Sequence, residues 1–249
     1  MAPLKLWFSL FDLSFNYKGK EPSFYPSTSF LWAADFEKHY DLILEELTQF
    51  LVAEAPKPYF KEEMVNKTNA YRTISLRWWD LEFRKNQGAF PVTSSLLLKY
   101  PEITTLSFNF LSPNSAIAPH CGDTNAIYRC HFGLTIPNES LGSGLSVKGE
   151  RVGWVQGKWL IFMDAFLHES VNDADEERII MLMDVLRPEF VSKREWINSV
   201  VLTSLFLQKR AVRFANIYRW PQWLVSGVAF CLLPFSYLSR KLANLLRWY

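Results

Sequence analysis

Two stretches of this 249-residue chain decide its fold: PHCGDTNAIYRCHFGLTIP at 119–137 and GWVQGKWLIFMDAFLHESVNDADEERIIMLMDV at 153–185. Within the first, residues 128–134 alternate apolar side chains with Arg129 and His131. An alternation with period two predicts a β-strand, and here one face of that strand would carry a cation and an imidazole.

Short apolar runs separated by Pro, Asn, Gly and Ser continue through residues 103–189. Many short, closely spaced strands predict a mainly β fold, either a sandwich or a jelly-roll barrel. The expected strands are 104–111, 126–136, 144–147, 151–155, 159–163 and 178–185.

The composition is that of a folded protein, with 49% hydrophobic and 21% charged residues. Its three cysteines are an odd number and do not form a disulfide framework, which favours a reducing compartment.

The segment before the strands has three different patterns. Apolar residues at three- and four-residue spacings predict one amphipathic helix over 35–52. Residues 75–91 show no clear period and contain a turn signal, Asn-Gln-Gly, at 86–88. The apolar residues 1–15 lack the features of a signal peptide and predict an arm packed on the surface.

The last 59 residues differ from the body in charge. Residues 191–249 carry nine basic side chains and one acidic, Glu195, whereas residues 1–190 carry 18 basic and 24 acidic. Residues 221–239 hold no charge, which approaches the ~20 residues needed to span a bilayer, although Pro234 interrupts them. We expect a helical tail that either associates with a membrane, spanning it or lying on it, or caps the barrel as a soluble element.

One 49-residue stretch of the β-rich region holds three of the four histidines, His120, His131 and His168. Arg129 and Arg178 lie in the same region. Adjacent strands are only ~4.8 Å apart, so such side chains can converge on one interior point. Neutral imidazole suits a transition metal, and two arginine forks suit a small dicarboxylate beside it. This combination favours a 2-oxoglutarate-dependent oxygenase.

The ordered motifs PHxG, RxH, FxH and ER within the quoted stretches resemble the aspartyl/asparaginyl β-hydroxylase family over residues 100–189. Upstream, FLWAADFEKHYDLILEEL at 30–47 is similar, more weakly, to the helix that precedes the barrel in bacterial members. The tail after Phe190 lies outside the resemblance. The resemblance implies a double-stranded β-helix, or jelly-roll, that binds Fe(II), takes 2-oxoglutarate as cosubstrate and reacts with O2.

The resemblance also implies roles for single residues. His120 and His168 match the two metal ligands, and Arg129 and His131 match the pair that contacts the metal-proximal carboxylate of 2-oxoglutarate. Arg178 matches the arginine that holds its distal carboxylate, so His120, His168 and Arg178 form the expected catalytic set.

Four further positions bear on these expected roles. Gly122 stands where the wider superfamily has a carboxylate ligand, as in members that use two histidines and a water. Asp123 is expected near the site or on the surface rather than on the metal, because residues i and i+3 of a strand do not share a face. Ile127 replaces an arginine that grips acidic substrates in animal members. Asn109 replaces a serine and is expected to donate a hydrogen bond to a cosubstrate carboxylate.

We therefore expect an Fe(II)- and 2-oxoglutarate-dependent dioxygenase that hydroxylates an unactivated C–H bond of a peptidyl Asp or Asn or a similar substrate. One alternative is a membrane-associated 2-hydroxylase of a lipid acyl chain, which Ile127 and the tail favour and Gly122 disfavours. Others are a non-catalytic jelly-roll module that binds a metal or small anion and, less favoured, a zinc hydrolase. No nucleic-acid partner is expected, and the expected location is the cytoplasmic side of a membrane.

The expected organisation has three parts. Residues 1–98 form an arm and a helical or irregular region that packs on the barrel, residues 99–190 form the jelly-roll core, and residues 191–249 form the basic, apolar tail.

Overall fold

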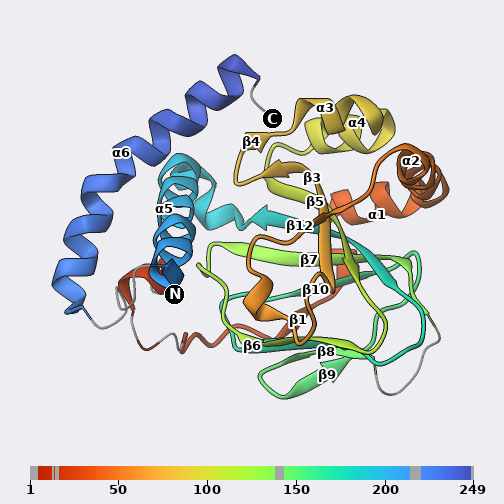
Figure 1. Ribbon diagram of the computed structural model, residues 1–249, viewed down its shortest axis with the longest axis horizontal. Coiled ribbons are helices and arrows are strands. Elements are labelled where there is room, and N and C mark those ends of the chain that lie inside the picture. The colour runs from red at the N-terminus through yellow and green to blue at the C-terminus, as the bar shows by residue number, and fades with distance from the viewer. Residues whose placement is uncertain (1–4, 13, 15–16, 138–142, 214–219, 248–249) are drawn as a thin grey trace.

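The computed structural model describes residues 5–12, 14, 17–137, 143–213 and 220–247, with backbone only at 211–213. Two antiparallel sheets face each other (Figure 1). The larger has eight strands in the order β1-β10-β7-β12-β5-β3-β2, with β4 paired to β3, and the smaller has the order β6-β11-β8-β9. This arrangement confirms the predicted mainly β jelly-roll.

The strands of the larger sheet are β1 Phe24–Tyr25, β2 Lys57–Pro58, β3 Tyr71–Trp78, β4 Leu81–Glu82, β5 Ile103–Leu111, β7 Ile127–Thr135, β10 Trp159–Phe162 and β12 Arg178–Leu186. Those of the smaller sheet are β6 Ser115–His120, β8 Gly144–Val147, β9 Glu150–Val152 and β11 His168–Asn172. The helices are α1 Leu31–Lys38, α2 Tyr40–Ala53, α3 Arg84–Ala89, α4 Pro91–Lys99, α5 Arg194–Arg213 and α6 Gln222–Leu246.

All six strands expected from the sequence are present, although β9 ends three residues before the expected end at 155. The sequence analysis did not identify β3, β6 or β11. Two of these, β6 and β11, belong to the smaller sheet and are short and rich in polar residues, so their apolar alternation is weak.

The single helix expected over 35–52 is wrong, because the chain forms α1 and α2 with a break at His39. His39 has φ −102° and ψ 13°, and its Nδ1 lies 2.8 Å from the Asp35 carbonyl oxygen. The side chain thus competes with the backbone for that carbonyl, which interrupts the helical ladder.

The turn expected at 86–88 is also wrong, since these residues lie inside α3. Asn86 Nδ2 donates to the Ser75 carbonyl at 2.8 Å, and Gln87 Nε2 donates to the Leu76 carbonyl at 2.9 Å. These two bonds to β3 hold the segment in a helical turn despite its glycine.

The main hydrophobic core lies between the larger sheet and helices α1, α2 and α4. Phe36, Leu97 and Phe108 are fully buried there. Each such side chain stabilises the fold by about 1.5–3 kcal/mol. The opposite face of the sheet is therefore free to line an interior site against the smaller sheet.

Strands β1 to β4 belong to the larger sheet, and β3 pairs with β5 along most of its length. The larger sheet therefore takes strands from both sides of the boundary expected at residue 98. In the N-terminal arm, Phe8 and Leu10 are buried against α5 and α6.

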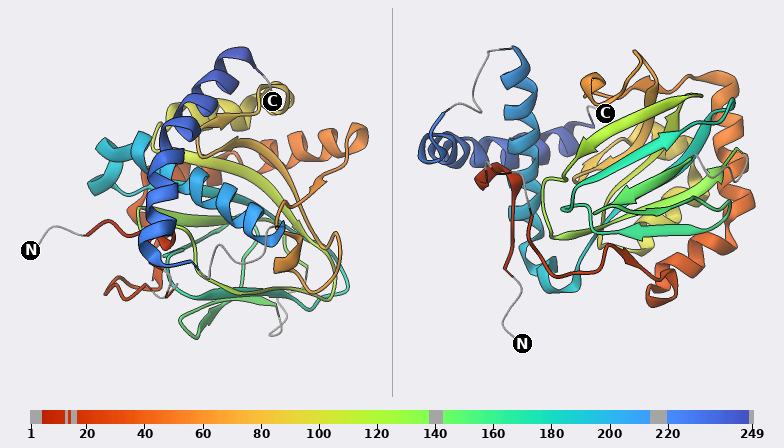
Figure 2. Two further views of the ribbon diagram at one scale, coloured as in Figure 1. Left: turned by 60° about the vertical axis from the view of Figure 1, so that its left-hand side comes forward. Right: turned by 90° about the horizontal axis from the view of Figure 1, so that it is seen from below.

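The tail forms two helices at the end of the molecule opposite α1 and α2 (Figure 2). Helix α5 packs on the body through Ile197, Val200 and Val201, and α6 packs one face on α5. Helix α6 is long and apolar enough to cross a membrane by length and composition, and Pro234 lies within it without ending it. Residues 214–219 and Trp248, which belong to the expected tail, lie outside the described residues.

Candidate active site

Two histidines face each other across neighbouring strands of the smaller sheet. His120 ends β6 and His168 begins β11, and the antiparallel register pairs these two positions directly. Their ring centres are 4.1 Å apart. One metal ion can therefore bind both rings.

Backbone carbonyls fix the orientation of both rings. His120 Nδ1 lies 2.8 Å from the Ala118 carbonyl oxygen, and His168 Nδ1 lies 2.8 Å from that of Phe166. Each Nδ1 thus carries the proton and donates it, which leaves each Nε2 with a free lone pair for a metal. Burial lowers the pKa of His120 to about 4 and that of His168 well below its ordinary 6.5, so both rings are neutral at pH 7.

A buried carboxylate lies beside the histidine pair. Asp164, in the loop between β10 and β11, has its Oδ1 3.5 Å from His168 Nε2. A Cβ added at Gly122 would come within 1.6 Å of Asp164 Oδ2. Asp164 therefore fills the space that a side chain at position 122 would need. Among the described residues, no three His, Cys, Asp or Glu side chains are placed to hold one ion, so His120 and His168 are the two side chains that this part of the chain offers a metal.

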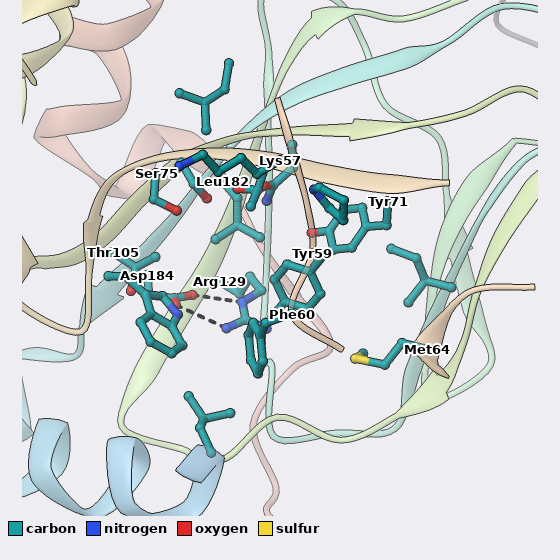
Figure 3. Close-up of a pocket in the computed structure, with 18 of the residues that line it drawn as sticks. Lys57, Tyr59, Phe60, Met64, Tyr71, Ser75, Thr105, Arg129, Leu182 and Asp184 are labelled. Atoms are coloured by element: carbon teal, nitrogen blue, oxygen red, sulfur yellow. Dashed lines mark hydrogen bonds and ion pairs between the residues drawn. The ribbon is translucent and has the colours of Figure 1, made fainter. Parts of the chain in front are cut away.

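Arg129 lies between Asp164 and Asp184, and Figure 3 shows its pairing with Asp184. Its Nη1 is 2.6 Å from Asp164 Oδ1, and its Nε and Nη2 donate to Asp184 Oδ1 and Oδ2 at 2.8 and 3.1 Å. Burial by itself would lower the pKa of Arg129, but the carboxylates of Asp164 and Asp184 together hold that pKa well above its ordinary value. Its guanidinium already has two carboxylate partners, and its contact with the cosubstrate stays a prediction.

Asp123 lies outside the metal site. Its Oδ1 accepts hydrogen bonds from Ser9 Oγ at 3.1 Å, Ser204 Oγ at 2.8 Å and Gln208 Nε2 at 2.8 Å. This carboxylate joins the N-terminal arm and α5 to the body, which agrees with the expectation that it is no metal ligand.

A second cation is buried without a carboxylate. Arg178, at the start of β12, is 2% exposed, and within the described parts of the chain its Nε and Nη1 have no hydrogen-bond partner. Its guanidinium lies 4.3 Å from the centre of the Trp154 ring. Burial lowers the pKa of Arg178 to about 10, as expected of a desolvated cation that lacks an anion.

The same tryptophan orients His131. Trp154 Nε1 donates to His131 Nδ1 at 3.3 Å, so the imidazole proton resides on Nε2, which has no partner among the described residues. Burial and then Arg178 lower the pKa of His131 well below 6.5, which keeps the ring neutral. Nearby, Asn109 is buried and its Oδ1 also lacks a described partner. Unpaired buried polar groups are costly, and a ligand or a water supplies the partner that each of them lacks.

These groups surround one cavity of about 890 Å³ between the two sheets. Five of the six predicted site residues line it, namely Asn109, His120, Arg129, His131 and His168. Arg178 is not among the lining residues, and its guanidinium lies against the Trp154 ring. In Figure 3, Tyr59, Phe60 and Met64 lie along the chain segment that crosses the cavity in front of Arg129.

The cavity extends from Arg129 to helix α5. Its walls there are Phe60, Trp78, Leu202, Leu205 and Phe206. Phe206 is half exposed, and so this apolar end of the cavity reaches the surface beside α5. Another arm of the cavity, lined by Glu54, Lys57 and Lys85, reaches the surface beside α2 and α3.

The sequence profile of a family described as aspartyl/asparaginyl beta-hydroxylase matches residues 37–188. The chain is 29% identical over 187 residues to an ornithine lipid ester-linked acyl 2-hydroxylase of Rhizobium tropici, covering 73% of this chain and 66% of that protein. It is 32% identical over 166 residues to the human aspartyl/asparaginyl beta-hydroxylase, covering 64% of this chain and 21% of that protein. The match thus spans about two thirds of one relative and a fifth of the other.

Among solved structures, a prolyl-4-hydroxylase of Pseudomonas putida is similar with a TM-score of 0.40 and 15% sequence identity. The likeness covers 61% of this chain and 87% of that one.

Proposed function

The chain belongs to the aspartyl/asparaginyl β-hydroxylase family, and we propose that it is an Fe(II)- and 2-oxoglutarate-dependent hydroxylase whose substrate is a lipid acyl chain. One combined observation carries the cofactor assignment. The Nε2 atoms of His120 and His168 each keep a free lone pair, and the buried cation Arg178 lacks a described carboxylate partner.

The charges of the buried groups support this assignment. Arg178 carries a positive charge, and no carboxylate among the described residues pairs with it. The distal carboxylate of a dianionic cosubstrate would supply the missing anion, and a divalent metal would balance the charge of the cosubstrate. This arrangement avoids an uncompensated buried charge.

Iron and 2-oxoglutarate, when bound with O2, supply the oxidising chemistry that converts a C–H bond to C–OH and releases succinate and CO2. His120 and His168 would hold the metal through Nε2, and Arg178 would hold the distal carboxylate of the cosubstrate. His131 would donate its Nε2 proton in a hydrogen bond to the near carboxylate. Asp164 remains beside the metal position, held there by Arg129.

The substrate assignment rests on the end of the cavity beside α5. Ile127, which replaces the arginine of animal members, is fully buried in the apolar cluster between the body, α5 and α6. No cation therefore stands at that position to bind an acidic side chain. The walls Leu202, Leu205 and Phe206 suit an apolar chain, and the Rhizobium relative is named an acyl 2-hydroxylase.

The test of the cofactor assignment is succinate formation by the full chain, reconstituted with Fe(II) without oxygen and then exposed to air with 2-oxoglutarate. His120→Ala and His168→Ala should each lower turnover by more than about 100-fold and weaken Mn(II) binding. The matched control is His39→Ala, whose Nδ1 lies 2.8 Å from the Asp35 carbonyl oxygen at the break between α1 and α2, and it should retain turnover. Full turnover in the His120 or His168 variant would refute the site. Metal binding with no turnover in the wild type would instead indicate the non-catalytic module.

The substrate is tested by mass spectrometry of lipids and peptides from strains with and without the protein. We expect a lipid acyl chain that gains the mass of one oxygen atom. A gain confined to peptidyl Asp or Asn would favour the peptide substrate instead.

A further inference from the structure

Helix α6 presents an uncharged apolar face to solvent. Its sequence has no charged residue from 221 to 239. Trp223 is 74% exposed and Leu245 is 76% exposed. The other large exposed apolar side chains of α6 are Phe230, Phe235, Tyr237, Leu238, Leu242 and Leu246. Contiguous apolar surface of this kind marks a site of interaction.

The charges of the tail after position 190 are almost all positive. Glu195, the one acidic residue after position 190, pairs with Arg240 and Lys241. Among the described residues, no acidic side chain forms an ion pair with Lys193, Lys209, Arg210 or Arg247. Uncompensated cations therefore lie at the end of α5 and the end of α6, on either side of the uncharged stretch.

Polar contacts tie the inner face of α6 to the body. Ser236 and Thr203 share a hydrogen bond of 2.7 Å, and buried Arg240 pairs with Glu195 and lies 3.7 Å from Asp80. Asn244 accepts from the Glu82 amide at 2.9 Å. A helix crossing a bilayer would lose these contacts and would carry a desolvated arginine into the hydrocarbon.

We propose that the outward face of α6 lies flat on an anionic lipid bilayer. The helix of 25 residues is about 37 Å long and would place Trp223 at the depth of the headgroups. Lys209 and Arg210 at the end of α5 and Arg247 at the end of α6 would meet anionic lipids. A second copy of this chain fits less well, because it would bring two sets of uncompensated cations together.

The proposal deepens the proposed function without depending on it. Helix α5, which walls the apolar end of the cavity, also packs on α6, so a bilayer beneath α6 lies close to the entry route for an acyl chain. Vesicle binding is measured without turnover, so failure of either proposal leaves the other standing.

The experiment is cosedimentation of the full chain with vesicles of phosphatidylcholine containing a quarter phosphatidylglycerol, and with vesicles of phosphatidylcholine alone. We expect stronger binding to the anionic vesicles and a loss of about tenfold in Phe235→Ser/Leu238→Ser/Leu245→Ser. The matched control is Leu31→Ser/Val52→Ser/Leu98→Ser, whose side chains are 89%, 87% and 69% exposed on other helices. This control should bind like the wild type. Equal binding by both triple variants would overturn the proposal, as would absence of binding together with a dimer in sedimentation.

A depth measurement separates lying on the bilayer from spanning it. Cys231 is exposed near the middle of α6 and accepts a fluorescent label, with Cys231→Ser as the unlabelled control. Quenchers high on the lipid chain should reduce the fluorescence more than quenchers near its end. The reverse order, with protein that resists carbonate extraction, would establish a spanning helix and overturn the proposal.

Discussion

Arg178 is a buried cation that the fold of the free protein does not satisfy. Burial lowers its pKa from an ordinary 12.5 to about 10, which corresponds to a cost of about 3 kcal/mol for keeping it charged. The Trp154 ring offsets part of this cost through a cation–π contact. The buried charge of Arg178 is fully compensated only when a ligand supplies an anion.

This cost leads to a prediction about stability. Arg178→Met should raise the free energy of unfolding of the metal-free protein by about 1–2 kcal/mol, because an unpaired buried charge is replaced by an apolar side chain. The same variant should lose the thermal stabilisation that 2-oxoglutarate gives the wild type in the presence of Mn(II). Urea unfolding and thermal shift assays measure the two effects. A variant that is less stable and still stabilised by 2-oxoglutarate would contradict the assigned role.

His131 gives the protein a predictable acid sensitivity. Its pKa is well below 6.5 in the fold and near 6.5 in the unfolded chain, so the unfolded state binds more protons between these values. Its contribution to stability is complete above pH 6.5 and is lost as pH falls, at up to about 1.4 kcal/mol per pH unit. His131→Gln should reduce the slope of unfolding free energy against pH by that amount in urea titrations between pH 6 and pH 5, with chelator present. An unchanged slope would mean that His131 is solvated or charged.

At the scale of single residues, the sequence predicts residues that lie in motifs. It gives no indication of residues that loops bring to the site. His120 and His168 were predicted from the PHxG and FxH motifs, although the strands β6 and β11 that carry them were not, and the structure brings the two rings together. Asp164 was missed because nothing in its local pattern distinguishes it from a loop carboxylate. Its only signal was the absent side chain at Gly122, which requires a group from elsewhere to fill the space.

At the scale of elements, prediction succeeded where the apolar period is unambiguous, as in β5, β7 and β12. It failed where side chains override the local pattern, as His39 does in breaking α1 from α2 and as Asn86 and Gln87 do in holding α3. These side-chain bonds depend on groups that sequence spacing does not reveal. Tertiary contacts therefore decide the boundaries of these helices.

The attachment of α5 and α6 depends on Asp80, which lies at the tight connection between β3 and β4 with φ 64°. Its carboxylate accepts from Arg194 at 2.5 and 2.7 Å and from Asn198, and its carbonyl accepts from Asn244 at 2.7 Å. The side chain of Asp80 thus holds α5, and the backbone carbonyl of Asp80 holds α6.

Asp80→Ala should therefore lower the free energy of unfolding by about 2–3 kcal/mol, because partly exposed Arg194 and buried Asn198 lose the carboxylate that accepts their hydrogen bonds. Amide exchange should accelerate in α5 and α6 more than in β5 and β7. The matched control is Glu54→Ala, which removes an exposed ion pair with Lys85 and should cost less than about 1 kcal/mol. Uniform acceleration across the molecule would argue against a local role for Asp80.

At the scale of the whole molecule, three parts of the chain build one cavity. The N-terminal region contributes Tyr59 and Phe60, the barrel contributes the histidines and Arg129, and the tail contributes Leu202 and Leu205. Sequence patterns predicted the barrel's share and a helical tail. They gave no sign that the tail lines the site, because that contact joins residues far apart in the sequence, such as Phe60 and Leu202.

Because α5 forms part of the cavity wall, a substitution in α5 tests the route by which an acyl chain enters. Leu202→Trp should narrow the end of the cavity beside α5 while leaving His120, His168 and Arg178 untouched. Succinate formation without added substrate should then stay unchanged, whereas hydroxylation of an acyl chain should fall by about tenfold through lost differential binding. Leu98→Trp, at an exposed position on α4, is the control and should alter neither rate. If both rates fell together in Leu202→Trp, the side chain would be supporting the metal centre. If neither fell, the substrate would enter by the other arm, beside α2 and α3.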